Sequence, residues 1–180
     1  MRFSPDKKSG FTLIELMVVI SIIGFMTTIV LSSLASARSK SRDAKRISDI
    51  HQIQTALELF YSDNGRYPRS GQCGATTPPS WTNSTECMSG GRWLRDSTSN
   101  LSGYITSDPA DVKNTIAFPT GAYYYFSAGY GAPYQWYMLV YTLENPNPSI
   151  EATDGVTAPD GTYFHYGGGS DGVITVGHGR

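Results

Sequence analysis

The stretch that decides the fold is residues 11–34, which read FTLIELMVVISIIGFMTTIVLSSL. Sixteen of these 24 residues are large and apolar, none is proline, and Glu15 carries the only charge. A helix rises about 1.5 Å per residue, so the stretch reaches about 36 Å, enough to cross a hydrocarbon core of about 30 Å. We therefore expect a membrane-spanning helix. The alternative, a buried helix of a soluble protein, is usually shorter.

The flanks of this stretch predict that it is retained in the mature protein. An ordinary secretory signal peptide ends at a small-residue cleavage site after its apolar core. Here the basic and small residues Lys7-Lys8-Ser9-Gly10 stand before the apolar core. The helical pattern continues through the small residues that follow the apolar core, so no cleavage site closes it. Glu15 is either an interfacial acid favoured by the helix N-terminus or the partner of a cation within the membrane.

After residue 34 the helical pattern becomes amphipathic. Apolar side chains recur every three or four positions and draw one stripe on the helix: Ile47, Ile50, Ile53, Leu57 and Phe60. Such a stripe predicts core contact with the domain that follows. The helix is expected to end at Asp63-Asn64-Gly65, because glycine suits a left-handed C-terminal position and Pro68 blocks continuation.

The rest of the chain has the composition of a small β domain. Residues 66–180 hold 16 of the 19 glycines and nine of the ten prolines. Aromatic and β-branched residues favour strands at 122–128 and 135–143, with weaker candidates at 162–166 and 173–176. We expect a three- or four-stranded antiparallel sheet packed on the helix stripe, which makes the fold class α+β.

The start of the chain resembles the processing site of type IV pilin-like proteins. The resemblance rests on residues 8–15, Lys-Ser-Gly-Phe-Thr-Leu-Ile-Glu, followed by the apolar run. It implies that a prepilin peptidase cuts after Gly10 and that Phe11 becomes the N-methylated first residue. Glu15 is then the filament-assembly glutamate, which pairs with the terminal amine of a neighbouring subunit. Residues 43–50 and the turn at 63–68, DNGRYP, are most similar to the major pseudopilin of type II secretion systems.

This resemblance implies four segments in a pilin-like fold. They are a cleaved basic leader at 1–10, a transmembrane and filament-core helix at 11–34, its amphipathic continuation at 35–64 and a globular antiparallel β domain at 65–180. The implied function is that of a structural subunit of a type II secretion pseudopilus, not an enzyme. One alternative is a type IV pilus or competence pilin subunit. A second is a signal-anchored extracytoplasmic binding or enzymatic domain that does not polymerise.

The implied partners are other copies of the chain in a helical homopolymer, minor pseudopilins, the prepilin peptidase and an inner-membrane assembly platform. Membrane lipid surrounds the helix before assembly. The net charge of −1 predicts no nucleic-acid partner, because such proteins bind phosphates through an excess of basic residues. The implied location is the bacterial inner membrane, in a single pass, and afterwards an envelope-spanning or surface filament.

The basic flanks bear on the orientation of that single pass. The leader offers three cations, whereas the other flank offers five: Arg38, Lys40, Arg42, Lys45 and Arg46. A simple positive-inside count therefore places the C-terminal domain in the cytoplasm. We place it outside instead, because the leader motif requires a cytoplasmic N-terminus for its peptidase and because two downstream cysteines suit an oxidising compartment.

Cys73 and Cys87 enclose 13 residues and are predicted to form a disulfide. A bridge over such a loop contributes about 3 kcal/mol in the chain-entropy model. The alternative is two free thiols.

Catalytic and metal signals are weak. His51, His165 and His178 fall in no zinc-binding helix motif. Three aspartates are each followed by glycine, as is common in turns: Asp154, Asp160 and Asp171. The alternative is a calcium site of carboxylate and backbone oxygens. The resemblance also implies calcium, which major pseudopilins bind in a C-terminal loop. No other cofactor is expected.

Overall fold

The computed structural model describes residues 10–70, 82–83, 94, 101–107, 109–112, 121–145, 148–151, 154–167 and 171–179. The chain divides into two compact units, one ending at Ser39 and the other beginning at Lys40. The predicted disulfide between Cys73 and Cys87 and the first nine leader residues lie outside the described residues.

Helix α1, Leu13–Asn64, belongs to both units. It begins directly after Thr12 and ends where Gly65 adopts a φ of +65° and donates its N–H to the Tyr61 carbonyl at 2.8 Å. Glycine adopts this left-handed conformation without steric cost because it has no Cβ. The long helix and its predicted end at residues 63–65 are confirmed.

In the first unit, α1 presents apolar side chains all around its surface. Large apolar side chains of residues 11–34 range from 42% exposed at Leu34 to 87% exposed at Phe11. The hydroxyls of Ser21, Thr27 and Thr28 donate to backbone carbonyls one turn earlier at 2.7–3.0 Å, so the helix itself satisfies them. Among the described residues, α1 is the one helix long and apolar enough to cross a membrane.

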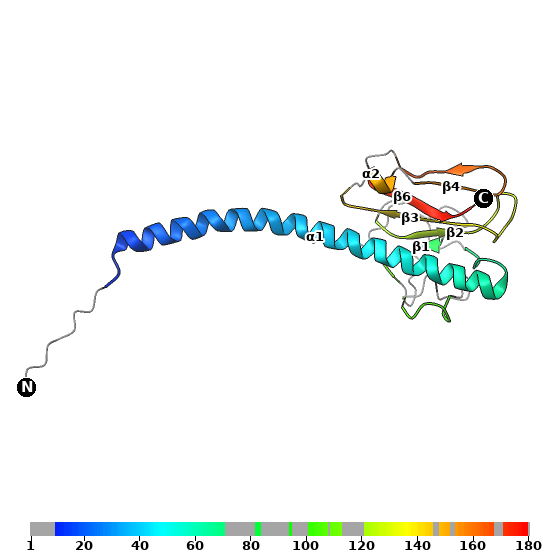
Figure 1. Ribbon diagram of the computed structural model, residues 1–180, viewed down its shortest axis with the longest axis horizontal. Coiled ribbons are helices and arrows are strands. Elements are labelled where there is room, and N and C mark those ends of the chain that lie inside the picture. Colours follow the sequence, from blue (N-terminus) through cyan, green and yellow to red (C-terminus); the bar gives the residue numbers. More distant parts are fainter. Residues whose placement is uncertain are drawn as a thin grey trace, which may run out of the picture. The chain divides into compact units, whose positions relative to one another are not determined.

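The second unit contains a four-stranded antiparallel sheet in the order β1-β2-β3-β6 (Figure 1). Its strands are β1 Thr82–Asn83, β2 Tyr124–Phe126, β3 Tyr137–Thr142 and β6 Val173–His178. β3 pairs with β6 along its whole length, from Tyr137 opposite His178 to Thr142 opposite Val173. A separate antiparallel pair is formed by β4 Val156–Thr157 and β5 Tyr163–Phe164. The one-turn helix α2, Pro148–Glu151, precedes β4.

Both faces of the main sheet are covered. Successive side chains of a strand point to opposite faces, so Tyr125 and Leu139 join one core while Tyr124 and Met138 join the other. The first core contains the α1 stripe, whose buried members are Ile50, Ile53, Leu57 and Phe60. The predicted contact of the stripe with the sheet is therefore confirmed, and Figure 1 shows the C-terminal half of α1 beside the sheet.

The second core corrects the predicted sheet. Phe164 lies in the predicted strand 162–166, but its strand β5 pairs with β4 in a separate sheet instead of adding to the main one. Val156 of β4 and Phe164 pack in the second core, on the face away from the stripe. The fourth strand of the main sheet is β1. Both β1 and β4 are two residues long, too short to show an alternating pattern.

Candidate functional site

The predicted cleavage junction lies just outside α1. Gly10 and Phe11 are exposed and precede the helix, which begins two residues after Phe11. Apart from its chain neighbours, no described residue lies within 4 Å of the position that a Gly10 Cβ would occupy. The bond between these residues is therefore accessible and free of helical hydrogen bonding, as a protease requires of a peptide bond that it must reach.

Thr12 and Glu15 form a capping box at the start of α1. The Thr12 hydroxyl accepts the backbone N–H of Glu15 at 3.3 Å. In return, Glu15 Oε2 accepts the Thr12 backbone N–H at 2.8 Å and the Thr12 hydroxyl at 2.7 Å. Such reciprocal bonds satisfy N–H groups that have no partner within the first turn of a helix. Glu15 is therefore held against the helix N-terminus, where negative charge is favoured.

The surroundings of Glu15 are apolar. A shallow surface groove beside it is lined by Phe11, Ile14, Val18 and Val19. A carboxylate in such a setting becomes costly once water is removed, unless a cation joins it. The arrangement therefore suits Glu15 to bind a positive group within a lipid or helix-packing environment.

A second charged site ties the C-terminal half of α1 to the rest of the second unit. Arg46 is 2% exposed, and its guanidinium binds Asp111 through two hydrogen bonds, at 2.8 and 3.0 Å. The same guanidinium reaches Asp43 at 2.8 Å and Glu144 at 2.9 Å. Arg42 adds a bidentate contact to Glu144, with both distances 2.7 Å. We call these five residues the Arg46 cluster.

Hydrogen bonds in the Arg46 cluster shift the pKa values of Asp43 and Arg46. Burial alone raises the pKa of Asp43, but the Glu144 and Asn145 backbone N–H groups, at 2.8 and 2.9 Å, hold the pKa below its ordinary value. Burial likewise opposes the charge of Arg46, yet the Asp111 contact raises the pKa of this guanidinium. Asp43 and Arg46 are therefore both charged at neutral pH. The cluster fastens α1 to the segments around Asp111 and Glu144.

The three aspartates of the calcium prediction make separate contacts. Asp160 accepts the Thr162 N–H at 2.9 Å and Asp171 accepts the Val173 N–H at 3.0 Å, as expected of turn residues. Asp154 is buried and accepts the Thr175 N–H. Within the described ranges, no three His, Cys, Asp or Glu side chains form a group that could hold a metal ion. Calcium binding stays a prediction, because residues 152–153 and 168–170 lie outside those ranges.

Asp154 differs from Asp160 and Asp171 because its carboxyl group is buried, which a role as an ordinary turn residue does not explain. Burial raises the pKa of this carboxyl, against the opposing effect of the Thr175 N–H. His165 Nε2 lies 3.0 Å from Asp154 Oδ2. In the described part of the chain, no other polar atom is hydrogen-bonded to Oδ2. The contact joins the segment before β4 to the residue that follows β5, and the Thr175 N–H connects Asp154 to β6.

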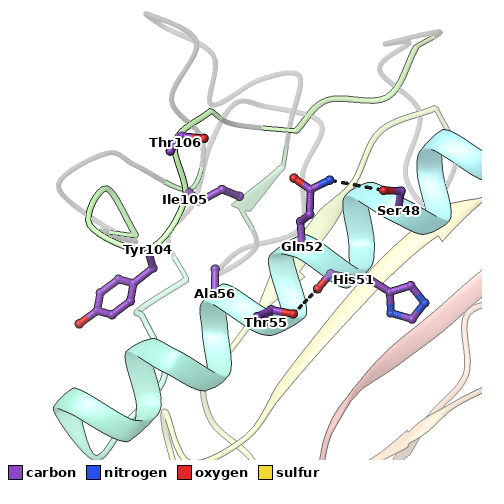
Figure 2. A pocket seen from close by; sticks show the side chains of 8 residues that line it. All are labelled: Ser48, His51, Gln52, Thr55, Ala56, Tyr104, Ile105 and Thr106. Carbon is purple, nitrogen blue, oxygen red and sulfur yellow. Dashed lines mark hydrogen bonds between the residues drawn. The ribbon is translucent and has the colours of Figure 1, made fainter.

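Surface hollows lie next to α1. Figure 2 shows one of them, a groove of about 420 Å³ between α1 and the 104–106 loop. The side chains that line it are mostly neutral: Ser48, His51, Gln52, Thr55, Ala56, Tyr104, Ile105 and Thr106. The dashed contacts there join helix residues to each other, from Gln52 to Ser48 and from Thr55 to the His51 carbonyl.

Two functional features escaped the sequence interpretation. The capping role of Thr12 carries a local signal, because threonine followed three positions later by glutamate is the capping-box pattern. The Arg46 cluster carries none. Arg46 and Asp111 are 65 positions apart, and Arg42 and Glu144 are 102 positions apart. No spacing along the sequence therefore predicts these ion pairs.

The residues from Gly10 to Glu15 lie in a part of the chain that is similar to known proteins. A model of the prokaryotic N-terminal methylation motif matches residues 5–31. The type II secretion system core protein G of Escherichia coli strain K12 is 41% identical over 69 residues, which are 38% of this chain and 48% of that protein. The N-terminal part of this chain is therefore pilin-like.

Other relatives of the pilin-like part point the same way. Core protein G of Aeromonas hydrophila is 41% identical over 66 residues, covering 37% of this chain and 46% of that protein. The type IV major pilin of Myxococcus xanthus is 35% identical over 66 residues, covering 37% and 30%. This chain spans about half the length of the core protein G relatives. No solved structure matches it.

Proposed function

We propose that the protein is a structural subunit of a type II secretion pseudopilus and not an enzyme. A prepilin peptidase cuts between Gly10 and Phe11, Phe11 is N-methylated, and the matured chains polymerise through α1. One coincidence carries this proposal. The matched residues 5–31 contain an accessible junction, a capped Glu15 and an apolar helix whose surface is exposed all round.

Charge pairing explains why such a site favours polymerisation. Cleavage after Gly10 gives Phe11 a positive amine, and Glu15 supplies a negative charge four residues further on. In a low-dielectric setting each charge is costly alone and strongly attracted to the other. A pair between two copies therefore sets the axial register of neighbouring helices. It acts mainly through specificity, because the cost of desolvating both charges offsets much of their attraction.

The exposed apolar surface of α1 also supports the proposed location. Before assembly, lipid of the bacterial inner membrane covers residues 11–34 in a single pass, with the C-terminal unit outside the cytoplasm. After assembly, α1 helices of other copies cover the same surface in an envelope-spanning filament. The remaining partners in this proposal are minor pseudopilins and an inner-membrane assembly platform. Secretion of folded cargo is then driven by growth of the filament.

A type IV pilus subunit is the second candidate. The similarity to the Myxococcus xanthus type IV major pilin favours it, although that match covers a smaller share of the relative than the core protein G matches do. A surface fibre formed at native expression levels favours the pilus. Loss of secreted proteins on deletion of the gene, with no surface fibre, favours the pseudopilus.

Processing is tested by the size of the residue before the cut. Gly10→Glu is expected to block cleavage, because the peptidase must accommodate a small residue there, whereas Gly10→Ala is expected to be cut. The measurement is the intact mass and N-terminal sequence of the protein recovered from a host with a prepilin peptidase. Wild-type protein should begin at a methylated Phe11. Recovery of wild-type protein that still begins at Met1, with no trimmed species, contradicts the proposal.

A further inference from the structure

We propose that Thr12 is a positioning residue for Glu15, and that its hydroxyl prepares the carboxylate to receive the amine of a neighbouring copy. The inference rests on the proposed function, because it assigns a role within the same assembly site. It starts from an asymmetry in the capping box. Both hydrogen bonds from Thr12 end on one carboxylate oxygen, Oε2 of Glu15, at 2.7 and 2.8 Å.

The other carboxylate oxygen stays available. Among the described residues, no hydrogen bond or ion pair involves Glu15 Oε1. Glu15 is exposed, and so are the apolar residues that flank it. A carboxylate has room for several donors on its two oxygens. Glu15 can therefore bind Thr12 in its own chain through Oε2 and an ammonium group of another copy through Oε1.

The capping box survives the proposed maturation. Cleavage after Gly10 leaves the peptide bond between Phe11 and Thr12 intact, so the Thr12 N–H remains an amide donor. The side-chain hydroxyl is likewise unchanged. The same three hydrogen bonds can thus form in the membrane-stored precursor and in the matured subunit.

Two physical consequences make this contact useful. Hydrogen bonds to Oε2 reduce the cost of keeping a carboxylate at the edge of an apolar segment. They also restrict the Glu15 side chain to one orientation before a partner arrives. A group that is already oriented loses less conformational entropy on binding, so association is favoured without any new contact between subunits.

The test compares four single variants and one double variant with wild type in a host that processes and assembles the protein. Thr12→Val removes the hydroxyl and keeps the side-chain shape, while Thr12→Ser restores the hydroxyl. Thr27→Val is the matched control, because the Thr27 hydroxyl donates to the Ile23 carbonyl in the same apolar helix and not to Glu15. Glu15→Gln keeps an acceptor for the capping box but removes the charge.

Two quantities are measured separately. Mass spectrometry gives the fraction of subunits that begin at Phe11, and the yield of sheared filaments is normalised to that fraction. Thr12→Val is expected to be processed normally and to assemble about fivefold less, the effect of one lost hydrogen bond. Thr12→Ser and Thr27→Val should assemble like wild type. Glu15→Gln should assemble far less than wild type, and Thr12→Val combined with Glu15→Gln should assemble as much as Glu15→Gln alone.

Each contrary result has a distinct meaning. The inference is overturned if Thr12→Val assembles like wild type, if Thr12→Ser fails as badly as Thr12→Val, or if Thr12→Val blocks processing. It is also overturned if the double variant assembles less than Glu15→Gln, because Thr12 then acts apart from Glu15. Normal assembly of Glu15→Gln contradicts the charge pairing of the proposed function itself. That outcome is separate from a failure of Thr12 alone.

Discussion

Arg46 carries a full charge in a position that is 2% exposed. The cost of burying it is offset by Asp111, Asp43 and Glu144, whose oxygens lie 2.8–3.0 Å from its nitrogens. Three acids around one buried cation also depend on that cation. If the guanidinium is removed, the buried carboxylates of Asp43 and Asp111 lose their contact with a cation and keep their own desolvation cost.

Arg46→Met is therefore expected to destabilise the second unit by about 3–5 kcal/mol, the usual cost of breaking a buried ion pair on one side. The free energy of unfolding is measured with denaturant on the full chain in detergent micelles, followed by near-ultraviolet circular dichroism. Arg42→Met is the matched control and should cost much less, since the Arg42 side chain is 34% exposed. Equal losses in the two variants contradict this account of the cluster.

The pKa of Asp43 predicts how stability depends on acid. Its folded pKa lies below the ordinary value of 3.8, so the unfolded chain binds the proton more readily. The contribution of Asp43 is then fully present above about pH 4 and is lost as the pH falls through the folded pKa. Asp43→Asn should be less stable at pH 7 and should lose less on acidification. Parallel curves of unfolding free energy against pH for the two proteins rule out this linkage.

At the scale of elements, one helix meets two different surroundings. Large apolar side chains cover all sides of α1 as far as Leu34 and are exposed. Beyond Lys40, the buried side chains form a stripe on one side, with Ile53 and Leu57 fully buried in the core beneath the sheet. The change follows from the sequence, because an all-round apolar helix needs lipid or other helices, whereas a striped helix needs one packed face.

The stripe can be tested with two leucines two positions apart. Leu57→Ala should destabilise the second unit by about 2–5 kcal/mol, because Leu57 is fully buried and its removal leaves a cavity. Leu59→Ala should change stability by about 0.5 kcal/mol or less, since Leu59 is 52% exposed. Denaturant unfolding of the full chain measures both. A larger loss in Leu59→Ala than in Leu57→Ala shows that the stripe is placed wrongly.

At the scale of the whole molecule, the division into two units separates anchoring from folding. The second unit has its own two cores, one on each face of the main sheet. The described residues of the first unit lack a packed core, and their apolar side chains are exposed. In the proposed function, lipid or further copies of the chain cover these side chains. The second unit therefore holds the fold of a subunit, and the first holds the surface through which the proposed filament assembles.

The disulfide prediction also belongs to this scale, because an oxidised pair requires a compartment outside the cytoplasm. Protein recovered from its native envelope is expected to gain the mass of two hydrogen atoms on reduction, as a Cys73–Cys87 bridge opens. Removing the bridge should cost about 3 kcal/mol in the chain-entropy model. Labelling of both thiols in the native, unreduced protein is the result that argues against the bridge and weakens the proposed orientation.

Local interactions let the amino-acid sequence determine α1 and the residues at its start. The apolar run, the stripe with its spacing of three or four, and Gly65 at the helix end each act within a few residues, so their pattern can be read along the chain. The same holds for the Thr12–Glu15 capping box, whose two residues stand three positions apart and whose hydrogen bonds the structure shows. The antiparallel hairpin of β2 and β3 was likewise predictable from two strongly aromatic segments.

Tertiary structure alone decided the partners of distant segments. Arg46 meets Asp111, and Arg42 meets Glu144, because the folded sheet brings two separate loops to one side of α1. The pairing of β3 with β6, and the separate β4–β5 pair on the far face, arise in the same way. Such contacts join residues that are far apart in the chain, and two-residue strands are too short to show a period. Packing and charge pairing in the folded protein therefore determine these contacts, and no pattern along the sequence predicts them.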